Sequence, residues 1–168
     1  IAKLSLWLRT AHKGRELTSL AEKIVCANSL LEMPFEEGSF DVVIGNPPYV
    51  QLQSMIEMSK TLKNRNYNTY ESMGDLYVLF YELGNRLLKQ NGLLGYVTSN
   101  KWMRAGYGST LRKYFVNNCN PLKLIDFGGY QVFENATVDT NILISEIAIS
   151  THQTKTCVLN RSVKSLNY

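Results

Sequence analysis

The chain has 168 residues, of which 45% are hydrophobic and 19% charged, and its formal net charge is +4. This length can bury one hydrophobic core, the apolar fraction excludes an intrinsically disordered chain, and the charge permits a polyanionic partner without requiring one. Three cysteines are too few for a disulfide scaffold, and no apolar run approaches the roughly 20 residues that span a bilayer. We therefore expect a soluble, cytoplasmic globular domain with no membrane partner. Because the chain starts at Ile1 inside a helical pattern, we also expect it to be part of a longer protein.

The first predicted elements are a helix and two strands. Apolar residues recur at helical spacing over residues 4–11, and His12-Lys13-Gly14 is typical of a helix end. The run Ile24–Ala27 predicts a short buried strand, followed by a turn. Residues Phe40–Gly45 form the clearest strand, because they are β-branched, nearly uncharged and bounded by glycine and proline.

A polar stretch over residues 50–74 shows neither a strand period nor a helix period, so we expect a long mobile connection there. A strong helix is predicted from Leu76 to Leu87, with Asp75 as its N-cap and Asn91-Gly92 as its C-terminal stop.

The second half continues the alternation of strands and helices. Residues 93–97 predict a strand, residues 104–108 a flexible loop, and Ser109 the cap of a helix that runs through Phe115. Two more strands are expected at residues 122–127 and 142–149.

This order predicts an α/β domain with a mostly parallel sheet. The last two strands are joined without a helical stripe, which favours an antiparallel C-terminal pair. We expect the domain to cover residues 1–150 and residues 151–168 to begin a linker.

The tetrapeptide Asn46-Pro47-Pro48-Tyr49 follows the clearest strand directly. Ligands of open α/β sheets bind at the carboxyl ends of the strands, so this position suits a functional site. The two prolines fix φ and remove two backbone donors, which leaves a stiff segment with free carbonyl groups. Asn46 adds a side-chain acceptor, and Tyr49 adds a flat aromatic face.

Two acceptors beside an aromatic face suit the exocyclic amino group of a planar base such as adenine. The amino lone pair of adenine is conjugated into the ring and is a poor nucleophile. Two acceptors that take hydrogen bonds from both N–H groups favour a pyramidal nitrogen, which frees its lone pair for attack. These four residues alone are equally compatible with an ordinary Pro-Pro turn in which Tyr49 packs on the surface.

The segment Phe40–Tyr49 resembles the catalytic motif of the S-adenosylmethionine-dependent DNA adenine-N6 methyltransferases. Further segments agree with that family in the same order: Ile1–Thr10, Ile24–Leu31, Asp75–Phe80, Asn91–Met103 and Gln131–Val138. The resemblance covers nearly the whole chain up to about Ser150, and it is strongest to the restriction–modification branch, which includes fusions of nuclease and methylase. It implies a partial Rossmann-like methyltransferase fold.

The resemblance implies a role for each residue of the motif. The side-chain oxygen of Asn46 and the carbonyl of Pro47 would accept hydrogen bonds from the target amino group. Tyr49 would stack on the flipped base, and Phe133 would cover the opposite face of that base. The alternative for Phe133 is a core aromatic between strands.

For the cofactor, S-adenosylmethionine, the resemblance points to Asn28, Ser29, Pro48 and Phe80, although Phe80 equally fits the apolar stripe of its helix. The family also binds the cofactor through a Gly-rich loop after its first strand and an acid that ends the second, and this sequence contains neither. We therefore expect a gap in the sheet, an incomplete cofactor pocket and an inactive isolated chain. Self-association through exposed strand edges would cover the gap.

The predicted DNA contacts are four cations in a stretch without acids: Lys101, Arg104, Arg112 and Lys113. They surround the loop Gly106-Tyr107-Gly108, and an ordinary solvated face is the alternative. Residues 50–74 would become ordered only on DNA, and residues 151–168 would lead to a downstream DNA-recognition region, with a fused or separate nuclease as a further partner.

No metal or general base is expected. His12 and His152 are isolated, the cysteines Cys26, Cys119 and Cys157 lack metal-ligand spacing, and the amino proton leaves only after attack on the sulfonium methyl. The sequence thus predicts methyl transfer to adenine N6 in duplex DNA after base flipping. Two alternatives stay open: methylation of a protein glutamine or an RNA base, and a non-catalytic DNA-binding remnant.

Overall fold

The computed structural model describes residues 2–14, 16, 19–20, 22–133 and 138–159. The chain divides into two compact units, residues 1–34 and residues 35–168. The first unit contains helix α1 (Ala2–Thr10). Its predicted end is confirmed, because the Ala11 amide still donates to the Trp7 carbonyl at 2.8 Å and Gly14 then takes a φ of 86°.

The predicted strand at residues 24–27 is wrong. The described part of the first unit contains no strand, and Val25 and Cys26 are exposed. A strand needs a neighbour for its backbone N–H and C=O groups, and an apolar run alone does not supply one.

The second unit is built on a five-stranded sheet in the order β1-β2-β4-β3-β5. Its strands are β1 (Phe40–Gly45), β2 (Leu88–Ser99), β3 (Asn120–Asp126), β4 (Thr140–Glu146) and β5 (Lys155–Val158). The β1–β2 and β3–β5 pairs are parallel, whereas β4 is antiparallel to both β2 and β3. The predicted α/β class, the common direction of most strands and the antiparallel β3–β4 pair are therefore confirmed. Strand β5 extends the sheet beyond Ser150, where the sequence showed no strand period.

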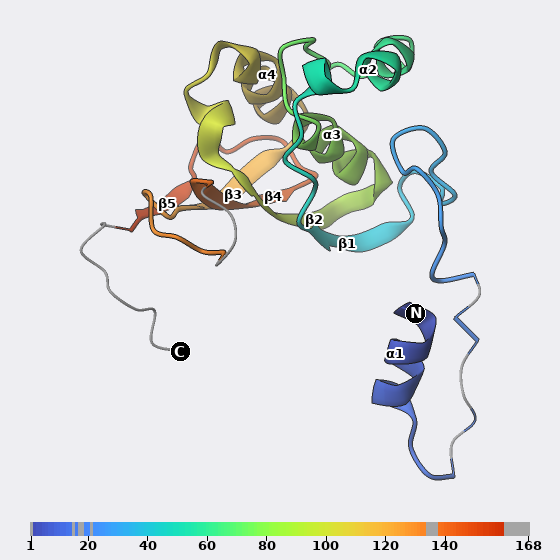
Figure 1. The fold of residues 1–168 in the computed structure, drawn as a ribbon. Helices are drawn as coiled ribbons and strands as arrows, with labels where there is room; N and C mark the ends of the chain where they lie inside the picture. Colours follow the sequence, from blue (N-terminus) through green and yellow to red (C-terminus); the bar gives the residue numbers. More distant parts are fainter. Residues whose placement is uncertain (1, 15, 17–18, 21, 134–137, 160–168) are drawn as a thin grey trace. The chain divides into compact units, whose positions relative to one another are not determined.

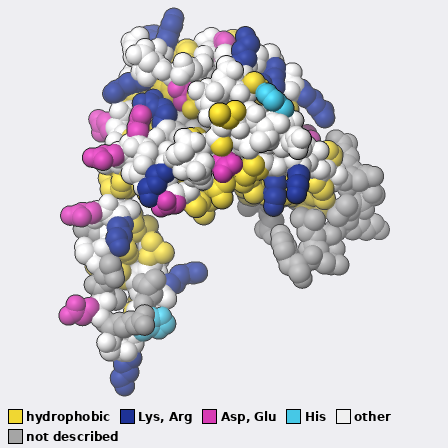
Figure 2. Space-filling view, turned by 180° about the vertical axis from the view of Figure 1, so that it is seen from behind, with side chains coloured by type: hydrophobic (Ala, Val, Ile, Leu, Met, Phe, Trp, Pro, Cys, Tyr) yellow, Lys and Arg dark blue, Asp and Glu magenta, His cyan; other side chains and the backbone are white. Residues whose placement is uncertain are grey.

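Helices α3 (Tyr77–Leu87) and α4 (Ser109–Asn118) cover one face of the sheet (Figure 1). Between them and the sheet lies a core of large buried side chains: Tyr77, Tyr81, Leu94, Leu111, Phe115 and Leu143. No described helix of this unit covers the opposite face (Figure 1). Val42 and Ile44 are 55% and 79% exposed there, and Figure 2 shows hydrophobic side chains along the lower border of this unit.

Two predicted ends of α3 are wrong. Asp75 makes no side-chain cap, since Leu76 occupies the N-cap position and the Asp75 carboxylate instead accepts a hydrogen bond from the Tyr107 hydroxyl at 2.7 Å. At the other end, the helix passes directly into β2 at Leu88, so Asn91 and Gly92 lie inside that strand, with Asn91 at a φ of 63°.

Residues 50–74 are folded, so the prediction of a mobile connection ordered only on DNA is wrong. They contain the 3₁₀ turn η1 (Leu52–Ser54) and helix α2 (Ile56–Lys63), and they bury Leu52 and Leu62 almost completely. The carboxylate of Glu82 on α3 accepts hydrogen bonds from the backbone amides of Asn68 at 3.1 Å and Thr69 at 2.9 Å. A buried polar contact of this kind fixes the segment without a hydrophobic period.

Candidate active site

The predicted motif lies at the carboxyl end of β1, where α/β sheets place their ligands. Asn46 and Pro48 are exposed, Pro47 is buried and Tyr49 is half-buried. Within the described residues, neither the Asn46 side chain nor the Pro47 carbonyl accepts a hydrogen bond. Both acceptors are therefore available to a ligand.

The ring of Tyr49 is held by two contacts. Its hydroxyl donates to the Val97 carbonyl on β2 at 3.1 Å, and its ring meets the Tyr77 ring edge-on, with 6.0 Å between the centroids and 84° between the planes. Burial raises the pKa of Tyr49 to about 12, so the hydroxyl stays a neutral donor at physiological pH. These contacts fix the plane of the ring beside Asn46.

The backbone ties the motif to the start of α3. The Leu52 amide donates to the Gly74 carbonyl at 2.9 Å, and the Leu76 amide donates to the Val50 carbonyl at 2.8 Å. Because Tyr77 follows directly, this short antiparallel contact sets the position of the Tyr77 ring, which meets Tyr49 edge-on. The sequence did not reveal this role of Tyr77, although the residue stands in the segment Asp75–Phe80 that resembles the family.

Phe133, the predicted second stacking ring, is half-buried, and its carbonyl accepts from the Gln131 side chain at 3.1 Å. Residues 134–137, which were predicted to be part of the same segment, lie outside the described residues. Asp126 lies at the base of this segment and accepts from the Gly128 amide at 3.1 Å and from the Asn100 side chain at 2.9 Å. The stacking role of Phe133 stays a prediction.

The predicted cofactor residues fall into both units. In the first unit, Asn28 and Ser29 form the predicted turn, with the Asn28 side chain accepting from the Leu30 amide at 3.3 Å. In the second unit, Pro48 is exposed at the end of β1, whereas Phe80 is half-buried and packs against the core. Pro48 thus fits a ligand contact, and the packing of Phe80 fits its alternative as a core residue.

The four predicted DNA-binding cations differ in their surroundings. Lys101 and Arg104 are exposed, at the 3₁₀ turn η2 (Asn100–Met103) and directly after it. The Arg112 guanidinium donates to the Trp102 carbonyl at 2.6 Å and to the Ala105 carbonyl at 3.2 Å, so it holds this turn in place. The glycine-flanked loop is also a second 3₁₀ turn, η3 (Gly106–Gly108), rather than an irregular loop.

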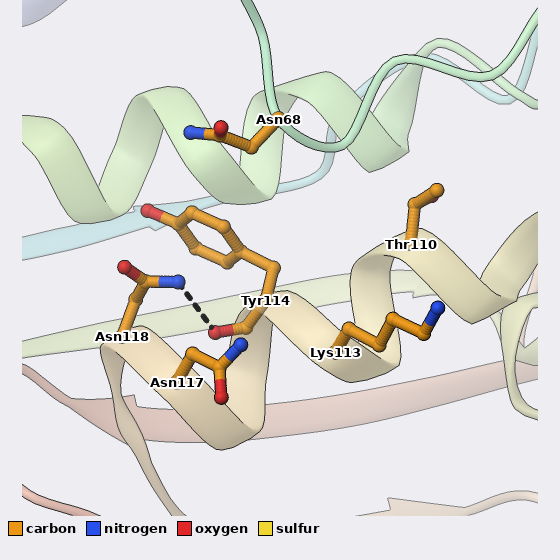
Figure 3. A pocket seen from close by; sticks show the side chains of 6 residues that line it. All are labelled: Asn68, Thr110, Lys113, Tyr114, Asn117 and Asn118. Carbon is orange, nitrogen blue, oxygen red and sulfur yellow. Dashed lines mark hydrogen bonds between the residues drawn. The ribbon is translucent and has the colours of Figure 1, made fainter.

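Lys113 lines a pocket between α4 and the segment that carries Asn68 (Figure 3). The lining residues are Asn68, Thr110, Lys113, Tyr114, Asn117 and Asn118. The Asn118 amide donates to the Tyr114 carbonyl at 3.0 Å, so part of this polar lining is already engaged (Figure 3).

Two features are absent from the residues that the structure describes. No three His, Cys, Asp or Glu side chains come together there in a way that could hold a metal ion. No helix there has both the length and the apolar character needed to cross a membrane.

Among solved structures, the fold is similar to a class I S-adenosylmethionine-dependent methyltransferase from Listeria monocytogenes, with a TM-score of 0.60 and 20% identity over 77% of this chain and 39% of that one. It is also similar to the methyltransferase subunit of a type I restriction–modification system from Streptococcus thermophilus, with a TM-score of 0.59 and 20% identity over 79% of this chain and 29% of that one. These likenesses support the methyltransferase fold.

Curated relatives agree with this fold. The type II restriction enzyme and methyltransferase RM.Eco57I of Escherichia coli is 33% identical over 77% of this chain and 14% of its own length. The type II methyltransferase M.BstVI of Geobacillus stearothermophilus is 37% identical over 67% of this chain and 20% of its own length. The chain thus spans a fifth or less of the length of these two relatives.

The profile of the Eco57I restriction-modification methylase family matches residues 1–133, which include the Asn46–Tyr49 motif and the turns that follow β2. The chain therefore belongs to the Eco57I restriction-modification methylase family.

Proposed function

We propose that this chain is the catalytic part of a restriction–modification DNA methyltransferase that transfers a methyl group to adenine N6 in duplex DNA. The observation that carries the proposal is the pair of free acceptors at Asn46 and Pro47 beside the fixed ring of Tyr49. S-adenosylmethionine, when bound, supplies the electrophilic methyl group. Its proposed contacts are Asn28 and Ser29 in the first unit and Pro48 and Phe80 in the second.

The motif acts on the amino group of the target base. The Asn46 side-chain oxygen and the Pro47 carbonyl accept hydrogen bonds from the two N–H groups, which makes the amino nitrogen more pyramidal and exposes its lone pair. Tyr49 stacks on one face of the extruded base and Phe133 on the other. Extruding a base costs a few kcal/mol, and stacking contributes about 1–3 kcal/mol per base, so two rings offset most of that cost.

The exposed cations Lys101 and Arg104 support DNA as the substrate, because phosphate contacts set the register of a protein on the duplex. Lys113 on the neighbouring helix and Arg112 beneath the turn extend the same basic segment. We propose that residues 1–150 form the catalytic part and that residues 151–168, which include strand β5 of the same sheet, lead to a DNA-recognition region. A fused or partner nuclease is consistent with the name of RM.Eco57I, and we place the protein in the cytoplasm, where it would meet DNA.

The test uses protein expressed from the complete reading frame that encodes these residues. It is incubated with S-adenosylmethionine labelled in the methyl group and with genomic duplex DNA, structured RNA or a release-factor protein as the acceptor. We expect label in DNA, recovered as N6-methyladenine by mass spectrometry of the nucleosides. Label in RNA or in a protein glutamine would replace this proposal with the alternative substrate. Binding of DNA without any transfer would favour the non-catalytic remnant.

We further propose that the isolated 168-residue chain binds the cofactor weakly and pairs with a second copy through β1. Among the described residues, this strand ends the sheet order and pairs with β2 only, so its outer edge is open to a strand from a second copy. Sedimentation analysis of the chain should show a dimer that Val42→Lys and Ile44→Lys dissociate. A monomer at all concentrations would contradict the pairing, and micromolar cofactor binding by calorimetry would contradict the incomplete pocket.

A further inference from the structure

A carboxylate with no predicted binding role lies next to the candidate active site. Asp75 is only 6% exposed, and it accepts a hydrogen bond from the Tyr107 hydroxyl at 2.7 Å. The Tyr77 hydroxyl lies 3.1 Å from the Tyr107 hydroxyl. Because Tyr107 gives its only hydroxyl proton to Asp75, Tyr77 must be the donor to Tyr107. A hydrogen bond to a buried carboxylate is among the stronger ones in proteins. Asp75, Tyr107 and Tyr77 therefore form a strongly hydrogen-bonded group.

At one end of this hydrogen-bonded group, Tyr77 contacts Tyr49, the ring that is proposed to stack on the target base. Tyr77 meets Tyr49 edge-on, and the two backbone hydrogen bonds that join Gly74 and Leu76 to the exit of the motif hold Asp75 in register. A shift of Asp75 or Tyr77 would therefore be transmitted to Tyr49.

At the other end of this hydrogen-bonded group, Tyr107 belongs to the basic turn, which we define as residues 100–108. The backbone of this turn packs closely against itself, because a Cβ added to Gly108 would lie 1.9 Å from the Trp102 carbonyl oxygen. The Arg112 guanidinium donates a hydrogen bond to the same oxygen. Tyr107 projects from the turn onto the start of α3, where a Cβ added to Gly74 would touch its ring at 3.6 Å. The exposed Lys101 and Arg104 are carried by the same turn.

We propose that Tyr107 is a positioning residue. Its hydroxyl, held by Asp75 and Tyr77, fixes the basic turn and its two exposed cations against the start of α3, where Tyr77 contacts the Tyr49 ring. The consequence for DNA rests on the proposed function: the phosphate contacts of Lys101 and Arg104 would set where the duplex lies, and the tyrosine contact would align that position with the ring that receives the base.

The first test follows the turn itself. Trypsin cleaves after Lys101 and Arg104, and the rate of cleavage reports how often the turn opens. In the 168-residue chain, Tyr107→Phe and Asp75→Ala should each accelerate cleavage at these two sites by about tenfold or more, the lower bound expected from the loss of one charge-assisted hydrogen bond. Asp75→Asn keeps an oxygen acceptor and should lie between these variants and the wild type.

Tyr70→Phe is the matched control, because it removes a half-buried hydroxyl that contacts Ser59 at 2.9 Å on the segment of residues 50–74. It should leave cleavage at Lys101 and Arg104 unchanged. Equal rates for Tyr107→Phe and Tyr70→Phe would overturn the positioning role. If Tyr107→Phe does not fold by circular dichroism, Asp75→Asn decides the question, since wild-type cleavage in that variant would equally overturn the role.

The second test separates this inference from the proposed function. With the protein from the complete reading frame, DNA affinity is measured against salt concentration, where each phosphate contact contributes about −0.9 to the logarithmic slope. Tyr107→Phe should flatten the slope by up to about 1.8, as should the double variant Lys101→Ala and Arg104→Ala, whereas a purely structural loss would leave it unchanged. Faster cleavage with an unchanged slope would overturn the DNA role of the turn and leave the tyrosine contact standing.

Discussion

The contact between Glu82 and the segment that follows the active-site motif offers a quantitative test of how this segment is held. Glu82 is 2% exposed and accepts four hydrogen bonds, from the amide and side chain of Asn68 and from the amide and hydroxyl of Thr69, at 2.9–3.2 Å. One carboxylate oxygen faces each residue. In Glu82→Gln, one oxygen becomes an NH₂ group that faces a backbone amide, so this amide loses its acceptor, and the bonds that remain are made to an uncharged group.

A hydrogen bond to a charged group contributes about 1.5–3 kcal/mol, and neighbouring bonds are not additive, so we expect Glu82→Gln to lower the free energy of unfolding by roughly 3 kcal/mol. At about 2–4 °C per kcal/mol for a chain of this size, the melting temperature should fall by about 6–12 °C. The assay is thermal unfolding followed by circular dichroism.

The control for this measurement is Glu57→Gln, which removes an exposed ion pair with Lys60 and should change stability by no more than about 0.5 kcal/mol. Trypsin should also cleave faster after Lys63 and Arg65, which lie just before the held residues, in Glu82→Gln only. Equal melting temperatures for the two variants would refute the argument that this carboxylate holds the segment.

Two further predictions concern buried titratable groups. Burial raises the pKa of the Cys119 thiol to about 12, so a thiol reagent at neutral pH should modify the exposed Cys26 and Cys157 first and Cys119 only after unfolding; equal rates at all three would contradict the buried position. Burial likewise raises the pKa of Tyr49, Tyr96 and Tyr107 from 10.0 to about 12. Because the folded-state pKa is raised, the stability linked to these hydroxyls is complete below pH 10 and is lost as the pH rises towards 12. Melting temperatures should fall within that window, and a constant value across it would argue against the burial.

The features that were predictable from sequence are local ones. Strand β1 and the motif after it could be found because a β-branched run, two prolines and a tyrosine stand next to one another. The antiparallel pairing of β3 and β4 followed from the absence of a helical stripe between them. In each case, the residues that determine the structure lie within the segment itself.

The features that were missed depend on partners far along the chain. The sequence around Asp75 predicts a helix cap, but its carboxylate accepts a hydrogen bond from Tyr107, 32 positions later. The sequence around Thr69 predicts a loop, but its amide donates to the buried carboxylate of Glu82. All four residues of the short strand β5 are exposed, and the strand forms through its pairing with β3. The run at residues 24–27 shows the converse: its pattern is apolar, yet none of these residues belongs to a strand.

The most direct test of the proposed catalytic site is Asn46→Ala in the protein from the complete reading frame, with transfer of labelled methyl groups to genomic DNA as the measurement. Removing one acceptor that acts on the reacting amino group should lower the rate by about 10²–10³, by analogy with the loss of one hydrogen-bonding group from an oxyanion hole. DNA affinity should stay the same, and Asn117→Ala, an exposed amide on α4, should keep full activity. Full methyl transfer by Asn46→Ala would contradict the assignment of this motif as the catalytic site.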